Sequence, residues 1–164
     1  MTMTPQAERH ELGYFMSVIC FKAAVVGMEE ALGEKAAAIA MIAAGRQRGK
    51  QLANDLNLAD QGDKLSISDV ADKARIALGS EGTRLCIIDK IEQEGDILRV
   101  YARETPCSHG EPDGSPRKCT YTLGAIQGFL ETFSNRRLRG NHVESVLRGS
   151  DHDVLEFTPL AYVL

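Results

Sequence analysis

The chain has 164 residues, a length that suits one domain and is short for two of ordinary size. Apolar residues make up 43% and charged residues 26%, which excludes a wholly disordered or fibrous protein. The net charge of −4 argues against a general nucleic-acid binder, whose affinity depends on an excess of Lys and Arg. Aromatic residues are only 5% and Trp is absent, so the core has to consist of Ala, Leu, Ile and Val.

Residues 1–12 are polar and are predicted to be a flexible N-terminal arm, with a single domain over 13–164. The arm lacks the basic-then-apolar order of a secretory signal. The apolar run Tyr14–Met28 is shorter than the ~20 residues that span a membrane, so we expect a core helix there. Cys20 and Cys86 lie in apolar runs and are predicted to be buried. A reducing, cytoplasmic location without a membrane span is therefore expected.

Three helices are predicted in the first half of the domain. The first covers the apolar run over 14–30, and the second covers the Ala-rich run from Gly33 to Leu56. Ser66 and Asp69 form a capping signal for the third helix, at Ile67–Leu78. All three precede any strand-like segment, which separates helices from strands along the chain.

The second half of the domain is predicted to contain two hairpins with a helix between them. A loop rich in Pro and Gly over 104–118 precedes that helix. The segments are Thr83–Asp89 and Ile97–Arg103 for the first hairpin, Leu123–Ser134 for the helix, and His142–Leu147 and Val154–Leu160 for the second hairpin. The order helix, helix, helix, hairpin, helix, hairpin predicts an α+β fold with helices packed on a mainly antiparallel sheet.

Two of the predicted helices have faces with almost no side-chain bulk. Gly45 and Gly49 in one, and Gly124 and Gly128 in the other, are four residues apart, so each pair shares a face. Glycine in a helix interior costs about 1 kcal/mol relative to alanine, which suggests a close approach by another element or by a ligand. Met41 shares the first face. A tight helix–helix contact and an apolar cavity of roughly several hundred Å³ both remain open.

The Pro/Gly loop contains a candidate metal site. Cys107 and His109 lie in the loop and Cys119 follows it, and thiolate and imidazole are ligands that zinc or iron would take. A fourth ligand is not evident unless the fold brings His142 or His152 close. The alternatives are a disulfide between the two cysteines under oxidation, or two thiols without a role.

Catalytic signatures such as GxGxxG, a Walker loop, HExxH and GxSxG are missing from the sequence, and no catalytic residue is assigned. Carboxylates near His152, including Glu144 and Asp153, suggest acid–base chemistry if they face a pocket, or else a solvated hairpin. The basic run around Arg137 suggests a seat for an acidic group of a ligand, or else a helix C-terminus that attracts cations.

Two segments resemble the 4-vinyl reductase domain family, also called hydrocarbon-binding domains. They are LGEKAAAIAMIAAGRQRGKQLANDL and CTYTLGAIQGFLETFSNRRLRGNHVESVLRGSDHDVLEF. The resemblance implies a fold similar to TRAPP transport subunits and haem-NO-binding gas sensors, often dimeric and with an internal apolar cavity. It is greatest to the stand-alone cyanobacterial members, which are linked to photosynthetic pigment handling and photosystem assembly.

The chain departs from this family at its closing hairpin. Many members have two cysteines where this chain has Leu147 and Leu155, so the family's full set of metal ligands is not present. Glu144, Gly149, Glu156 and Phe157 match the pattern. The resemblance therefore supports the fold more than any activity.

The resemblance implies non-catalytic binding of a small hydrophobic molecule, either a tetrapyrrole or another hydrocarbon or lipid-like compound, by a homodimer. Photosystem-assembly proteins are expected as partners, and nucleic acid is not. A vinyl reductase of chlorophyll biosynthesis is the first alternative, but no nicotinamide or flavin fingerprint is present. An assembly scaffold without a ligand is the second. The residues predicted to contact the ligand are Met41, Gly45, Gly49, Gly124, Gly128 and Arg137.

Overall fold

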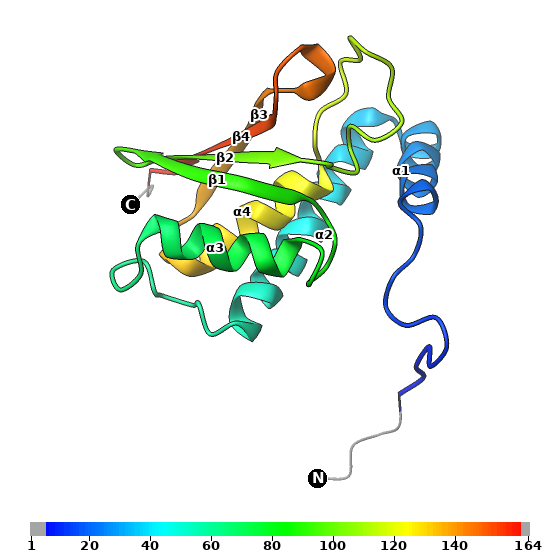
Figure 1. Ribbon diagram of the computed structural model, residues 1–164. Helices are drawn as coiled ribbons and strands as arrows, with labels where there is room; N and C mark the ends of the chain where they lie inside the picture. Colours follow the sequence, from blue (N-terminus) through cyan, green and yellow to red (C-terminus); the bar gives the residue numbers. More distant parts are fainter. Residues whose placement is uncertain (1–5, 162–164) are drawn as a thin grey trace.

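A computed structural model describes residues 6–161 (Figure 1), so part of the predicted N-terminal arm, residues 1–5, lies outside the described residues. The helices are α1 (Val18–Leu32), α2 (Glu34–Asp55), α3 (Ile67–Leu78) and α4 (Tyr121–Ser134). The strands are β1 (Ile87–Glu94), β2 (Ile97–Arg103), β3 (Leu138–Glu144) and β4 (Asp153–Pro159), with a short 3₁₀ turn, η1 (Val146–Arg148), before β4.

The strands form one sheet in the order β1-β2-β4-β3, and every neighbouring pair is antiparallel. Figure 1 shows α3 and α4 along one face of this sheet. Behind them α2 packs against α4, and α1 packs against α2. The predicted α+β class, with helices on an antiparallel sheet, is confirmed.

The core lies between the sheet and the layer of α3 and α4. Phe129 and Leu130 of α4 meet Val100, Leu155 and Phe157 of the central strands, and all five are at most 1% exposed. These aliphatic and aromatic side chains alternate along each strand, so one sheet face is apolar and the other carries ion pairs such as that between Arg99 Nε and Glu156 Oε2, 2.9 Å apart.

The predicted limits of α3 are confirmed, and those of two strands are wrong. The α3 capping box is present, with Ser66 Oγ accepting from Asp69 N at 3.1 Å. The first strand begins at Ile87 rather than at Thr83, because Thr83 N donates to Ala77 O at 2.8 Å and so closes a turn against the end of α3. β3 begins at Leu138 rather than at His142. The exposed residues in its first half are polar, so the sequence there does not show the alternation of apolar and polar residues that predicts a strand.

The glycine faces of α2 and α4 lie against each other, backbone to backbone. A Cβ atom at Gly49 would lie 1.9 Å from Ala125 O, and one at Gly128 would lie 2.0 Å from Arg46 O. Gly45 and Gly124 have the same kind of contact, at 2.1 Å. The neighbouring helix therefore occupies the space beside these glycines, which leaves no room for a cavity between the two faces.

α1 lies at the edge of the molecule and packs on α2 (Figure 1). Val25 is its buried residue, and Cys20 is exposed, so the predicted burial of Cys20 is wrong. Cys86 is buried as predicted. Within residues 6–161 no helix is both long enough and apolar enough to cross a membrane.

Candidate functional site

An apolar pocket lies where α2, the connection from α3 to β1 and the start of α4 meet. Its volume is about 110 Å³. Apolar walls come from Leu52, Leu78, Leu85 and Ala125, and the remaining lining comes from Arg48, Gly49, Thr83 and Tyr121. Gly49 of α2 and Ala125 of α4 are both in this lining, so the pocket borders the contact between α2 and α4.

The hydroxyl of Thr83 is the unusual feature of this pocket. Among the side chains of residues 6–161, Thr83 Oγ1 is the buried nitrogen or oxygen atom that has no hydrogen-bond partner. Leaving a buried polar group unpaired costs about 1–3 kcal/mol. The turn after α3 fixes the backbone at this residue, because Thr83 N donates to Ala77 O and Leu85 N donates to Leu78 O, both at 2.8 Å.

The volume of the pocket limits what it can hold. Sites for drug-sized ligands occupy roughly 300–1,000 Å³, whereas an engineered apolar cavity of about 150 Å³ binds benzene. A pocket of about 110 Å³ therefore suits a single ring or a short chain. Thr83, whose hydroxyl oxygen is buried without a hydrogen-bond partner, is one of the residues that line the pocket.

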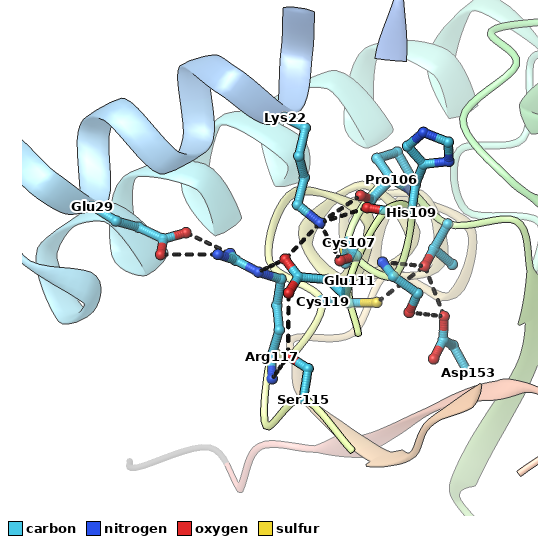
Figure 2. A network of polar contacts seen from close by, with 12 residues as sticks. Lys22, Glu29, Pro106, Cys107, His109, Glu111, Ser115, Arg117, Cys119 and Asp153 are labelled. Atoms are coloured by element: carbon cyan, nitrogen blue, oxygen red, sulfur yellow. Dashed lines mark hydrogen bonds and ion pairs between the residues drawn. The ribbon is translucent and has the colours of Figure 1, made fainter. Parts of the chain in front are cut away.

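A second, polar site surrounds Asp153, the first residue of β4 (Figure 2). Its carboxylate accepts hydrogen bonds from Thr105 Oγ1 at 2.7 Å, Ser108 Oγ at 2.8 Å and Val146 N at 3.2 Å, and it contacts His142 Nε2 at 3.2 Å. Burial by itself would raise the pKa of Asp153, but these hydrogen bonds outweigh burial and hold that pKa well below its ordinary value.

Both ring nitrogens of His142 are engaged in this site. The backbone N–H of Cys119 donates to Nδ1 at 3.0 Å, so Nδ1 carries no proton and Nε2–H donates to Asp153. Cys119 Sγ, a ring nitrogen of His142 and a carboxylate oxygen of Asp153 lie within 4.8 Å of one another. The histidine and the carboxylate therefore already have hydrogen-bond partners, and the cluster is a buried polar network. His142 is unavailable as a base, because both of its ring nitrogens are engaged in hydrogen bonds.

The predicted set of Cys107, His109 and Cys119 is only partly assembled. Cys107 Sγ lies 3.8 Å from Thr122 Oγ1, and Cys119 Sγ lies 3.9 Å from Thr105 Oγ1. The imidazole of His109 is exposed and points away from them in Figure 2, and its backbone carbonyl instead accepts from Lys22 Nζ at 2.9 Å. His142, which the sequence analysis considered as a further ligand, lies beside Cys119 in place of His109.

The Pro/Gly loop is bound to α1 by charged side chains (Figure 2). Lys22 Nζ donates to Cys107 O at 2.7 Å and pairs with Glu111 Oε1 at 2.9 Å, and Arg117 forms a two-pronged pair with Glu29. Beside this link lies a cleft of about 460 Å³ that includes Met41 in its lining. The loop is therefore held in place from α1.

The residues predicted to contact a ligand are spread over the molecule. Gly49 lines the apolar pocket, Met41 lines the cleft beside α1, and Arg137 lines a polar cleft of about 570 Å³ at the far end of α2 and α4. Gly45, Gly124 and Gly128 lie in the helix contact. Sequence reasoning missed Thr83, because the residue was assigned to a strand and no local signal marks it as facing a pocket.

No known protein-family model and no curated protein matches the chain. Solved structures with the same architecture include the following two. The phenol-responsive sensory domain of the transcription activator PoxR, solved with phenol, matches 88% of this chain and 75% of its own, with a TM-score of 0.66 and 13% identity. The second is subunit 3 of the trafficking protein particle complex (TRAPP) from Naegleria fowleri, covalently bound to palmitic acid. The match covers 88% of this chain and 93% of that subunit, with a TM-score of 0.55 and 14% identity.

The chain has the fold of these two proteins. At this identity the likeness establishes the fold, including the predicted similarity to TRAPP subunits, while membership of the 4-vinyl reductase family stays a prediction.

Proposed function

We propose that the chain binds a small apolar molecule, with a single ring or short chain and one hydroxyl or carbonyl group, in the pocket beside Thr83. The observation that carries the proposal is the buried, unpartnered Oγ1 of Thr83 in the lining of an apolar pocket. Support comes from the two structural neighbours, one of which holds phenol and the other palmitic acid.

The pocket favours the hydrocarbon alternative over the tetrapyrrole. A tetrapyrrole has four pyrrole rings, whereas the volume of about 110 Å³ is close to that of a benzene-binding cavity. We propose binding without catalysis, because His142 and Asp153 satisfy each other and are not among the residues described as lining the pocket. Pigment handling and photosystem assembly gain no support from this pocket.

The test compares phenol with toluene as probes, by calorimetric titration of the wild-type protein and of Thr83→Val. The variant keeps the side-chain volume and loses the hydroxyl. Phenol is expected to bind about fivefold more weakly to Thr83→Val, because one hydrogen bond contributes about 1 kcal/mol, whereas toluene binding is unchanged. Thr158→Val on β4 is the matched control and should leave both affinities unchanged. Phenol affinities equal in the wild type and Thr83→Val, or no saturable binding of either probe, would overturn the proposal.

We also propose a homodimer that covers the outer face of α1 and α2. Ile19 of α1 and Ile39 of α2 are 67% and 63% exposed. The exposed residues of α1 are mostly apolar, and those of α2 are apolar over residues 36–44 and polar or charged from residue 47 onward. Light scattering after gel filtration should show a dimer for the wild type and a monomer for Ile19→Asp/Ile39→Asp. Ile76→Asp on α3, where the side chain is 57% exposed, should remain dimeric. A monomeric wild type would refute the dimer.

A further inference from the structure

The polar cleft of about 570 Å³ at the far end of α2 and α4 gathers cationic side chains, and we call it the basic cleft. Four of its lining residues are cationic: Arg46 and Lys50 of α2, and Arg136 and Arg137, which follow the end of α4. The lining has two carboxylates, Glu131 and Asp60. The chain as a whole has a net charge of −4, so this excess of cations is local.

Two of the four cations are already paired with carboxylates. Arg46 binds the buried carboxylate of Glu131 through Nε at 2.6 Å and Nη2 at 3.1 Å, which leaves its third nitrogen, Nη1, for another acceptor. Arg136 Nη1 lies 3.1 Å from Asp96 Oδ1, but both side chains are exposed, and a pair of this kind contributes little to stability. Arg136 can therefore exchange this partner for another anion.

The other two cations, Lys50 and Arg137, have no carboxylate partner. Among residues 6–161, the ion pairs made by the cations of this cleft are those of Arg46 and Arg136. The backbone on either side of the Arg137 side chain is fixed, because Arg137 O accepts from Leu160 N at 2.9 Å and Leu138 N donates to Glu131 Oε2 at 3.0 Å. The start of β3 therefore anchors Arg137 beside the cleft.

The helix dipoles do not account for the whole cluster. Cations are favoured at the C-terminal end of a helix, and this explains a basic residue directly after α4, but the effect falls off within the last turn. Neither α2 nor α4 has a basic residue in its last turn, and Lys50 lies more than one turn before Asp55, where α2 ends. Lys50 therefore lines the cleft for a reason other than the helix end.

We propose that the basic cleft binds a phosphate group, held by Lys50, Arg137 and Nη1 of Arg46. A phosphate monoester carries up to two negative charges, which matches the two cations without partners. Its several oxygens can accept from more than one cation at once, and guanidinium groups suit this geometry. The described linings of this cleft and of the pocket beside Thr83 share no residue, so the two sites are separate.

The carboxylate of Asp60 opposes the phosphate and provides a second test. Its side chain is exposed, and its backbone N–H donates to Thr132 O of α4 at 3.1 Å. Asp60 has a φ of 55°, in the left-handed region that asparagine also tolerates, so Asp60→Asn removes the charge without straining the loop. Phosphate should bind more tightly to this variant.

The experiment titrates the full-length protein with inorganic pyrophosphate by calorimetry. Lys50→Met and Arg137→Gln should each weaken binding about tenfold, because each removes a charged donor. Asp60→Asn should strengthen binding about threefold, because a like charge is gone. Arg139→Gln is the matched control, because Arg139 is an exposed arginine of β3 that is not among the residues described as lining the cleft, and it should leave the affinity unchanged.

A lipid headgroup and a soluble phosphate compound are the two sources of such a group. Co-sedimentation with phosphatidylcholine vesicles that contain phosphatidic acid, lost in Lys50→Met and Arg137→Gln but kept in Arg139→Gln, would assign the phosphate to a lipid. Saturable pyrophosphate binding with the same dependence on these variants, but without co-sedimentation, would assign it to a soluble compound.

Two results would overturn the proposal. One is the absence of both saturable pyrophosphate binding and vesicle binding by the wild type. The other is an equal loss in Arg139→Gln and Arg137→Gln, which would mean that only the overall charge matters. If Lys50→Met or Arg137→Gln fails to fold, Asp60→Asn decides, because an affinity no higher than that of the wild type would refute the site. Phenol affinity should be the same in all of these variants, so a failure here is distinct from a failure of the pocket beside Thr83.

Discussion

Replacing Gly128 with alanine tests whether α2 and α4 touch through their backbones. The new Cβ would lie 2.0 Å from Arg46 O and 2.9 Å from Arg46 C, against an ordinary contact distance of 3.4–4 Å. Both obstructing atoms belong to the backbone of α2, which cannot rotate away as a side chain can. The two helices must therefore separate by more than 1 Å along the seam.

The magnitude follows from two opposing effects. Alanine in a helix interior is favoured over glycine by about 1 kcal/mol. Overpacking costs about 1–3 kcal/mol and sometimes more, and here the separation also loosens the contacts at Gly45, Gly49 and Gly124. We therefore expect Gly128→Ala to lower the free energy of unfolding by a net of about 2 kcal/mol.

Urea titration followed by circular dichroism measures this loss, with all proteins at one concentration because a dimer's stability depends on it. With a slope of about 2 kcal/mol per molar urea, the midpoint should fall by about 1 M. Gly27→Ala is the matched control, because Gly27 lies inside α1 and a Cβ there would meet nothing within 4 Å. It should raise stability by about 0.5–1 kcal/mol. A Gly128→Ala midpoint at or above that of the wild type would refute the close contact.

Three further substitutions probe the polar groups by the same titration. Thr83→Val should raise the stability of the unliganded protein by about 1 kcal/mol, because it removes an unpaired buried hydroxyl; a loss would mean that the hydroxyl has a partner. Asp153→Asn should cost about 2–3 kcal/mol at pH 7. The pKa of Asp153 is lowered in the folded state, so the charged carboxylate stabilises the fold fully at pH values above its unfolded pKa of about 4. This stabilisation is lost as the pH falls through the lowered pKa. The difference in unfolding free energy between the wild type and Asp153→Asn should therefore shrink below about pH 4. A gap that stays constant between about pH 5 and pH 3 contradicts this. Arg46→Met should cost about 2 kcal/mol, because it leaves the carboxylate of Glu131, only 6% exposed, without its guanidinium, and Arg46→Met/Glu131→Gln should recover part of the loss. A double variant no more stable than Arg46→Met would show that the unpaired charge is not the cause.

Local patterns were enough to predict the fold class. The Ser66–Asp69 capping signal and the helical spacing after it depend on neighbours within one turn, so α3 was placed correctly at both ends. The strand limits failed where contacts outside the predicted strand decide them. Thr83 is held by the end of α3, and Leu138 pairs with Pro159 on β4. Neither contact is visible in a window of a few residues.

The sequence by itself determined that two helices have small-residue faces, that the chain forms an α+β domain, and that two cysteines flank a turn-rich loop. Only the tertiary structure decided what those features meet. The glycine faces meet each other, the backbone N–H of Cys119 meets His142, and Thr83 lines a pocket. Periodicity along a chain reports which side chains share a face, because that depends on the geometry of one element. What lies opposite that face depends on how distant elements pack, and a cavity forms only where such elements meet.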